Sequence, residues 1–398
     1  MEGHPCIETM VRLEQWLRAK RRFPTSSSAP ILRLGDFFSG CGGMTLGTVE
    51  AGRRSGFRIV PSLAVDMLEA AGLVYATNFP GVDVLHDDIT LHVDGPLDAQ
   101  QPTRAERQLL DRTGPLDIIV GGPPCQGHSD LNNHTRREDG RNDLYLRMAR
   151  AVLLYRPYLA VIENVQTVTR SSTNVVTRTR EVLGLAGYRT KEIVARGHHM
   201  GLPQRRVRHF TIAQREDLTE PTFLLPQRGE RSVMTAIGDL SVGTTLFETP
   251  STHQRQNVER IAWLFGAGWT LEEAHADYNE GSVKHPQAFN LVNHRRPRCH
   301  QNGHNYPAVY GRMRPNEAAP TITRGFGSTG QGRFVHPMEP RTLTPHEAAR
   351  VQTFPDFFSF EPVTARGDLH TLIGNAVPPL MMLDLLTPYL GTIQSSML

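Results

Sequence analysis

The residue best placed for chemistry in this 398-residue sequence is a cysteine in the stretch LDIIVGGPPCQGHS, residues 116–129. The apolar run ends at two glycines and two prolines, which predicts a buried strand that stops at a rigid turn. Cys125 follows this turn directly. Open α/β sheets bind their ligands at the carboxyl ends of strands, and a thiolate displayed there is a strong nucleophile. We therefore expect Cys125 to be catalytic.

An acidic residue and two arginines further along the chain could assist this nucleophile. Glu163 ends the apolar run of VIENV, residues 161–165. A carboxyl group beside an apolar floor can hold or donate a proton. In QRRVR, residues 204–208, strand alternation places Arg206 and Arg208 on one face and Arg205 on the other. Taken alone, each feature is also compatible with a solvated strand end.

A glycine-rich turn predicts a ligand site near the N-terminal end of the same fold. The sequence DFFSGCGG, residues 36–43, follows an apolar strand and opens a helix, where a backbone without Cβ atoms can approach a ligand closely. Asp66 ends the second strand and is placed to bind a ribose. Asp88 and Ile89 follow the third strand and can contact an adenine. By itself the turn is compatible with NAD, FAD or no ligand.

Strands and helices alternate from residue 31 to residue 185, which predicts an α/β fold with a doubly wound, mostly parallel sheet. The expected strands are 32–37, 58–64, 83–85, 116–120 and 159–163, and the expected helices are 44–54, 68–78, 143–155 and 175–185.

Composition shifts divide the chain into four parts. We expect a helical extension and linker at 1–30, a catalytic domain at 31–215, a smaller irregular β-rich domain at 216–336, and a segment at 337–398 that completes the catalytic domain. Between residues 281 and 336, eight Lys or Arg face a single acid, so this segment carries about +7 and the rest of the chain about −4. A basic module on a near-neutral body suits a polyanionic partner, although a solvated basic surface would look the same.

The cysteines and the hydropathy exclude several classes of protein. Four cysteines are widely separated, so reduced thiols and a reducing compartment are expected. Cys299 lies near three histidines, but the spacing matches no common zinc site, and we expect no metal. The longest apolar runs are far shorter than the roughly 20 residues that cross a bilayer. The sequence therefore predicts a cytoplasmic protein with no membrane partner.

Several segments together resemble the motifs of the DNA cytosine-5 methyltransferases of bacterial or phage type, and they occur in the family's order. They are DFFSGCGG (36–43), PPCQ (123–126), ENV (163–165), QRRVR (204–208), APTITRGF (319–326), RTLTPHEAAR (341–350) and GNAVPP (374–379). The resemblance covers residues 32–379. One departure is His346, which occupies a position where the family usually has arginine and which puts a local salt bridge in question.

The resemblance implies S-adenosylmethionine as the cofactor of a Rossmann-like methyltransferase. The residues implied in its binding are Phe38, Ser39, Gly40, Gly42, Gly43, Asp66, Met67, Asp88, Ile89, Pro124, Leu144, Asn375 and Val377. Cys41, in the same turn, is interpreted as a small filler.

The same resemblance implies methylation of cytosine C5 in a specific sequence of double-stranded DNA. Cys125 would add to C6 of a flipped-out base, Glu163 would act at N3 and N4, and Arg206 and Arg208 would hold the base and the catalytic loop. The second domain would be the target-recognition domain. DNA contacts are expected from Gln126, Ser129, Thr321 and Arg324. We expect a monomer, and a cognate restriction endonuclease or another defence protein is left open as a partner.

Three other interpretations compete with this one. A tRNA cytosine-5 methyltransferase of the same fold would share the chemistry, although the basic recognition domain favours duplex DNA. A Rossmann-type oxidoreductase explains the glycine turn and Asp66 but not Cys125, Glu163 and Arg208. A catalytically inactive DNA-binding regulator would be expected to lack one of the core residues, and none is missing.

Overall fold

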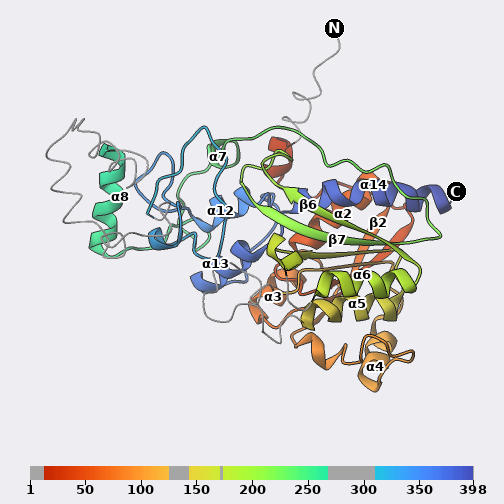
Figure 1. Ribbon diagram of the computed structural model, residues 1–398. Coiled ribbons are helices and arrows are strands. Elements are labelled where there is room, and N and C mark those ends of the chain that lie inside the picture. Colours follow the sequence, from red (N-terminus) through yellow and green to blue (C-terminus); the bar gives the residue numbers. More distant parts are fainter. Residues whose placement is uncertain (1–12, 125–142, 171–173, 268–309, 398) are drawn as a thin grey trace, which may run out of the picture.

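The computed structural model describes residues 13–124, 143–170, 174–267 and 310–397 (Figure 1). Within these residues, seven strands form one sheet in the order β3-β2-β1-β4-β5-β7-β6. The strands are β1 (Ile31–Phe37), β2 (Arg58–Val65), β3 (Asp83–Leu85), β4 (Ile118–Gly121), β5 (Leu159–Asn164), β6 (Tyr188–Arg196) and β7 (Val207–Arg215). The pairs from β3 to β5 are parallel, and β7 runs antiparallel between β5 and β6. The predicted α/β class with a mostly parallel sheet is confirmed.

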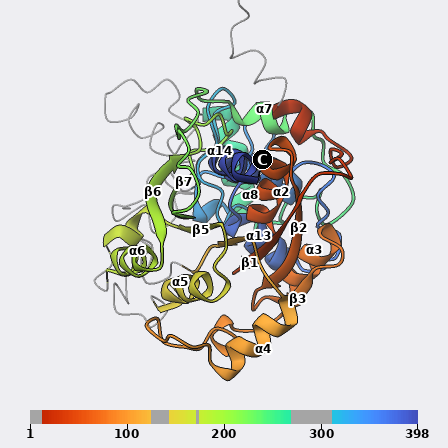
Figure 2. The same cartoon turned by 90° about the vertical axis from the view of Figure 1, so that its right-hand side faces the viewer.

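Helices cover both faces of this sheet, as Figure 2 shows with the sheet between two groups of helices. One face packs against α2 and α14, and the other against α5 and α6. The helices of this part are α2 (Gly43–Arg54), α3 (Glu69–Asn78), α4 (Arg104–Thr113), α5 (Asp143–Tyr155), α6 (Val175–Leu185) and α14 (Pro379–Met397), with short 3-10 turns η1 (Ile89–Leu91) and η3 (Gln166–Arg170).

Strand β4 and the first four residues of β5 are apolar at every position because both faces of these strands are buried. In β4, Ile118 and Val120 belong to the core beneath α2 and α14, whereas Ile119 belongs to the core beneath α5 and α6. In β5, Val161 belongs to the core beneath α2 and α14, and Ile162 belongs to the core beneath α5 and α6. A strand that is buried on both faces has a continuous apolar sequence. The polar residues of β5 therefore occur at its carboxyl end.

The last helix returns to the first part of the chain. A Cβ on Gly47 of α2 would lie 2.2 Å from the carbonyl oxygen of Pro379, so α2 and α14 are in direct backbone contact. Within the described residues, the stretch Arg366–Ser396 is long and apolar enough to cross a membrane, and 72% of its most apolar window is buried inside the protein. The burial of this window accounts for its apolar character, because α14 is a core helix.

The remaining described residues gather beside the carboxyl ends of the strands, at the left of Figure 1. They contain α7 (Val233–Ile237), α8 (Arg255–Ala267), the turn η4 (Thr329–Gln331), α12 (Pro345–Val351) and α13 (Arg366–Asn375). Between residues 216 and 336, the described part holds isolated bridges such as Arg312 with Val335 rather than named strands. The boundaries at 30, 215 and 336 stay predictions.

Candidate active site

The glycine-rich turn between β1 and α2 has a backbone that only certain residues tolerate. Gly40 and Gly42 have φ of 51° and 91°. Phe38, which directly follows β1, has φ of 59°. A Cβ on Gly42 would lie 2.6 Å from the Phe79 ring, and one on Gly43 would lie 2.4 Å from the carbonyl oxygen of Val377. A Cβ on Gly40 would meet no described protein atom within 4 Å. The turn is therefore packed on one side and open at Gly40.

Asp66 shapes the open side of this turn. Its carboxylate accepts hydrogen bonds from the backbone N–H of Gly40 at 2.8 Å and of Leu68 at 2.9 Å. Burial raises the pKa of Asp66, and these two N–H groups oppose the shift. The hydroxyl oxygen of Ser39 is buried and has no hydrogen-bond partner among the described residues. The turn thus presents an acceptor carboxylate and an unsatisfied hydroxyl group, as a site for a polar ligand requires.

The other expected cofactor residues lie around the same sheet edge. Asp88 caps η1, accepting from the backbone N–H and the hydroxyl of Thr90 at 2.9 and 2.8 Å. Ile89 is buried, whereas the side chain of Met67 is 72% exposed. Leu144, the second residue of α5, is partly buried against the core beneath that helix. Phe38 packs partly into this core as well.

A carboxylate and a guanidinium meet at the carboxyl end of β5. Glu163 Oε1 lies 2.7 Å from Nε of Arg208, the second residue of β7, because β7 pairs antiparallel with β5. Their side chains are 11% and 16% exposed. A Cβ on Gly122 would lie 3.1 Å from Glu163 Oε2, so the carboxylate also faces the loop that follows β4. Two of the expected site residues, Glu163 and Arg208, are therefore in contact.

Asn164 fixes the start of the loop that carries the cysteine. Its side-chain amide donates to the carbonyl oxygen of Pro123 at 3.2 Å. Pro124 is the last described residue before the loop, and it is partly buried. Cys125, Gln126 and Ser129 lie outside the described residues. The structure thus brings Glu163 and Arg208 to the base of this loop.

Arg206 has different surroundings from Arg208. Its side chain is 1% exposed, and its guanidinium donates to the carbonyl oxygens of Ile322 at 2.8 Å, and of Gly374 and Asn375 at 3.4 Å. A Cβ on Gly374 would lie 2.1 Å from the backbone nitrogen of Arg324, so these segments are in close contact. Arg206 therefore joins the segment before β7 to two others, and the side chain of Asn375 is left exposed.

Gln204 is a residue at this junction that the sequence analysis did not single out. Its amide donates to the carbonyl oxygen of Val351 at 3.0 Å and to Gln352 Oε1 at 2.7 Å, and its oxygen accepts from Ile322 N–H at 3.3 Å. Gln352 in turn donates to the carbonyl oxygen of Ile373 at 2.6 Å. Both glutamines are fully buried. The only available signal was the position of Gln204 in QRRVR.

The expected DNA-contacting residues that the structure describes lie near this junction. The hydroxyl of Thr321 donates to the carbonyl oxygen of Arg205 at 3.1 Å. Arg324 is exposed. Arg205 points away from Arg206, as alternation predicts, and pairs with Glu230 at 2.8 Å.

Two further groups of the glycine turn are buried in the protein. Burial raises the pKa of Asp36 well above its ordinary value, and Asp36 accepts a hydrogen bond from Thr45 at 2.6 Å. Burial also raises the pKa of Cys41 to about 12, and its sulfur lies 3.7 Å from the carbonyl oxygen of Leu372. A thiol with this pKa stays protonated and unreactive at neutral pH, as expected for a filler. Asp36 stood in the quoted motif without an assigned role.

Comparisons with known proteins agree on one family. The model of the family described as C-5 cytosine-specific DNA methylase matches residues 32–387. The chain is 42% identical over 374 residues to Type II methyltransferase M1.BsuMI of Bacillus subtilis, covering 92% of this chain and 82% of the relative. It is 29% identical to Type II methyltransferase M.DdeI of Desulfomicrobium norvegicum, covering 87% of this chain and 85% of the relative.

Solved structures share the fold. A protein assigned as a DNA modification methyltransferase encoded within an E. coli prophage superposes with a TM-score of 0.61 at 23% identity, covering 91% of this chain and 99% of that one. The methyltransferase EhMeth of Entamoeba histolytica superposes with a TM-score of 0.60 at 17% identity, covering 90% and 97%.

Proposed function

The chain belongs to the C-5 cytosine-specific DNA methylase family, and on this premise we propose that it transfers a methyl group from S-adenosylmethionine to C5 of a cytosine flipped out of a specific sequence in duplex DNA. The observation that supports the catalytic part is the Glu163–Arg208 pair, held against the loop that leads to Cys125. A carboxylate and a guanidinium beside the segment that leads to the Cys125 thiol match the needs of a pyrimidine that must be activated.

The residues of the glycine turn fit the proposed cofactor. When bound, S-adenosylmethionine supplies an electrophilic methyl group on a sulfonium centre. Asp66 would accept hydrogen bonds from its ribose, the unsatisfied hydroxyl of Ser39 would bond its polar end, and the space beside Gly40 would let the backbone approach it. The exposed side chain of Met67 would pack on the adenine.

The protein groups act on the cytosine ring. C5 and C6 are covered by stacking in a duplex, so the base must leave the helix at a cost of a few kcal/mol. The Cys125 thiolate would form a bond to C6, and the electron pair displaced from the C5–C6 double bond would make C5 nucleophilic. A proton held by Glu163 would stabilise the ring at N3, and Arg208 would hold the carboxylate and contact O2. C5 would then take the methyl group as the donor's C–S bond breaks. Loss of the C5 proton to water and departure of the Cys125 thiolate from C6 would restore the aromatic ring.

The partners and location follow from this function. Duplex DNA is the proposed substrate, with Thr321 and Arg324 on the binding side and Gln126 and Ser129 in the loop after Cys125. The names of the Type II relatives support a role in restriction and modification, with a cognate endonuclease as partner. We place the protein in the cytoplasm as a monomer, associated with the nucleoid through DNA.

Bisulfite sequencing of DNA from cells that express the protein tests the proposal. DNA from cells with the wild-type protein should contain cytosines that resist bisulfite conversion in one sequence context. DNA from cells with Cys125→Ser should contain none. The matched control is Cys41→Ser, because that thiol is buried and its pKa is raised to about 12, so its loss should leave the pattern unchanged. Transfer of a labelled methyl group, measured separately with DNA and with tRNA, distinguishes which of the two nucleic acids is the substrate. Methylation by Cys125→Ser near the wild-type level would refute the nucleophile.

A further inference from the structure

The N-terminal segment, defined as residues 13–23, packs against residues that are distant from it in the sequence. Leu13, Trp16 and Leu17 are buried in the core that also contains Val351 and Phe354. The Trp16 ring stacks on Phe23 with centroids 6.0 Å apart. A backbone hydrogen bond also connects the two regions: Asp356 N–H donates to the carbonyl oxygen of Leu17 at 3.0 Å. The segment is therefore an integral part of the C-terminal core.

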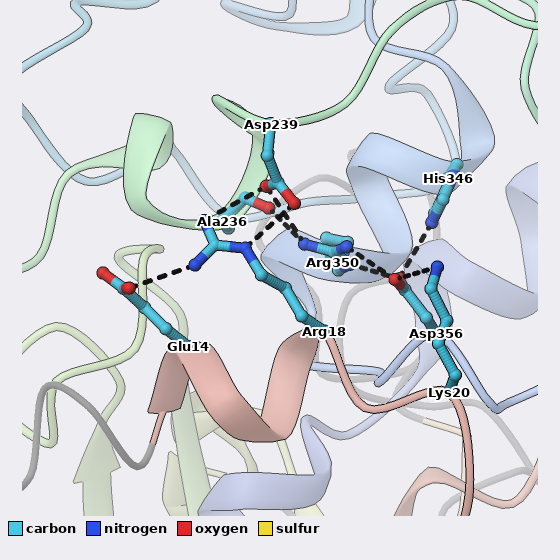
Figure 3. A network of polar contacts seen from close by, with 8 residues as sticks. All are labelled: Glu14, Arg18, Lys20, Ala236, Asp239, His346, Arg350 and Asp356. Atoms are coloured by element: carbon cyan, nitrogen blue, oxygen red, sulfur yellow. Dashed lines mark hydrogen bonds and ion pairs between the residues drawn. The ribbon is translucent and has the colours of Figure 1, made fainter.

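Charged groups fasten the same segment to α12 and to the residues after α7, as Figure 3 shows. Arg18 pairs with Asp239 at 2.9 Å, and Lys20 pairs with Asp356 at 2.7 Å. Arg350 of α12 contacts both acids, and His346 lies 3.2 Å from Asp356. Burial alone would raise the pKa of Asp356, but its bonds to His346, Arg350 and Lys20 hold that pKa well below the ordinary value. His346 thus keeps a contact to an acid at the position where arginine is usual.

Thr353, just after α12, is the point where this segment meets a strained backbone. Its φ is 67°, a left-handed conformation that is unfavourable for a β-branched residue. Such a conformation persists only where the surroundings hold it. The indole N–H of Trp16 donates to the carbonyl oxygen of Thr353 at 2.9 Å, in a buried contact. The N–H of Thr353 donates to the carbonyl oxygen of Arg350 at 2.9 Å.

The side chain of Thr353 faces the loop GNAVPP, residues 374–379. Its hydroxyl oxygen accepts from the backbone N–H of Leu380 at 3.3 Å, directly after this loop. The preceding residue, Gln352, donates to the carbonyl oxygens of Ile373 and Ala376 on the other side. The loop is in turn pressed against the glycine turn, since a Cβ on Gly43 would lie 2.4 Å from the carbonyl oxygen of Val377. One strained residue therefore connects the N-terminal segment to the predicted cofactor loop.

We propose that Trp16 is a positioning residue for the cofactor site: its indole N–H fixes Thr353, which sets the place of the loop 374–379 against the glycine turn. This inference rests on the proposed function for the identity of the cofactor. It also gives the N-terminal segment a role in the reaction that its distance in sequence from every quoted motif does not suggest.

Binding of S-adenosylhomocysteine, measured by isothermal titration calorimetry, tests this role without catalysis. Trp16→Phe keeps an aromatic ring in the core but removes the N–H donor. It should weaken binding about three- to tenfold, the loss expected for one buried hydrogen bond. Lys20→Ala is the matched control, because its side chain is 77% exposed and bonds only an acid that Arg350 also holds. It should bind as wild type does.

A double-mutant cycle separates positioning from general loosening. Thr353→Ala removes the hydroxyl that accepts from Leu380 but keeps the carbonyl that accepts from Trp16. If the effect passes through this hydroxyl, Trp16→Phe should add little further loss in the Thr353→Ala protein. Independent, additive losses would overturn the proposal. If Trp16→Phe fails to fold, unchanged affinity in Thr353→Ala alone would overturn it.

Hydrogen exchange provides a readout that needs no ligand. Amides in a peptide covering 374–380 should exchange faster in Trp16→Phe than in wild type, and equal exchange would contradict the inference. Failure of wild-type protein to bind S-adenosylhomocysteine would instead contradict the proposed function. Binding by wild type with unchanged binding by Trp16→Phe would contradict the positioning role alone.

Discussion

Arg206 and Arg208 stand two residues apart before and within β7, yet their environments differ sharply. Arg206 is 1% exposed and is surrounded by backbone carbonyl oxygens from residues 322, 374 and 375. Arg208 reaches the sheet edge and pairs with one carboxylate, Glu163, where both side chains keep some exposure. Hydrogen bonds to three buried carbonyl oxygens make Arg206 a structural connection between segments, whereas Arg208 at the sheet edge is placed to bind a substrate atom as well as Glu163.

The contrast separates fold stability from chemistry within one short motif. The family resemblance implies that both arginines hold the base and the catalytic loop, with Arg208 as the expected contact to the cytosine O2. The contacts described here assign the buried arginine to the junction between the segments before β7, around 322 and around 374. They pair the edge arginine with Glu163. Variants of the two should therefore fail in different assays.

The largest effect is expected from Glu163→Gln, which keeps the shape of the side chain and removes its carboxylate. Methyl transfer to DNA should fall about 10²- to 10⁴-fold, the usual contribution of general acid–base catalysis. Binding of S-adenosylhomocysteine should not change. Single-turnover methylation assays and calorimetry measure the two. A variant with near wild-type turnover would remove Glu163 from the reaction.

Arg206→Met should act mainly on stability. It leaves several buried carbonyl oxygens without their donor, and we expect the free energy of unfolding to fall by about 3 kcal/mol. Urea denaturation measures it, and Arg206→Lys should recover part of the loss because it restores a donor. A fully stable but inactive Arg206→Met protein would show that this arginine serves the substrate instead.

Arg208→Met should show the reverse pattern. The Glu163–Arg208 pair is one ionic contact at the sheet edge, so its loss should lower the free energy of unfolding by less than the loss of Arg206 does. Methyl transfer should nevertheless fall about 100-fold, because the carboxylate and the base lose the group that orients them. The same denaturation and turnover assays apply. Loss of stability comparable to that of Arg206→Met would erase the contrast between the two arginines.

The smallest effect concerns pH. Burial, helped by the nearby Arg366, lowers the pKa of His370 to about 4 from its ordinary value. His370, in α13, packs on Phe326 with ring centroids 4.5 Å apart. The unfolded chain binds a proton below about pH 6.5, whereas folded His370 stays neutral down to about 4, so stability falls as pH decreases through this window. In thermal melts, His370→Gln should reduce the fall in melting temperature between about pH 6.5 and pH 4. An unchanged pH dependence of the melting temperature would show that other groups cause the decline.

The sheet core was predictable from sequence because its strands and helices carry their own signals. Continuous apolar runs identified β4 and β5, and glycines marked the start of α2. Helix α4 was missed, although Thr103 and Glu106 form a capping box that the sequence displays. Strand β6 was missed because it carries exposed polar residues, such as Lys191, that hide its alternation.

The candidate site was predictable as a set of residues, but its internal division was not. Alternation correctly placed Arg205 apart from Arg206, yet it also grouped Arg206 with Arg208. What separates those two is burial beneath residues 322 and 374, which are more than 100 positions away in the sequence. The same holds for Gln204 and for Thr353, whose partners come from distant segments. Local patterns cannot reveal contacts that only the folded chain creates.

The central claim is that a sulfur atom of this protein bonds transiently to the pyrimidine ring. A duplex that carries 5-fluorocytosine in the methylated sequence, offered together with S-adenosylmethionine, tests it directly, because the fluorine cannot leave as the C5 proton does. Wild-type protein should form a denaturation-resistant complex, and mass spectrometry should locate the bond at Cys125. Absence of any complex, or a complex that persists in Cys125→Ser, would contradict the account.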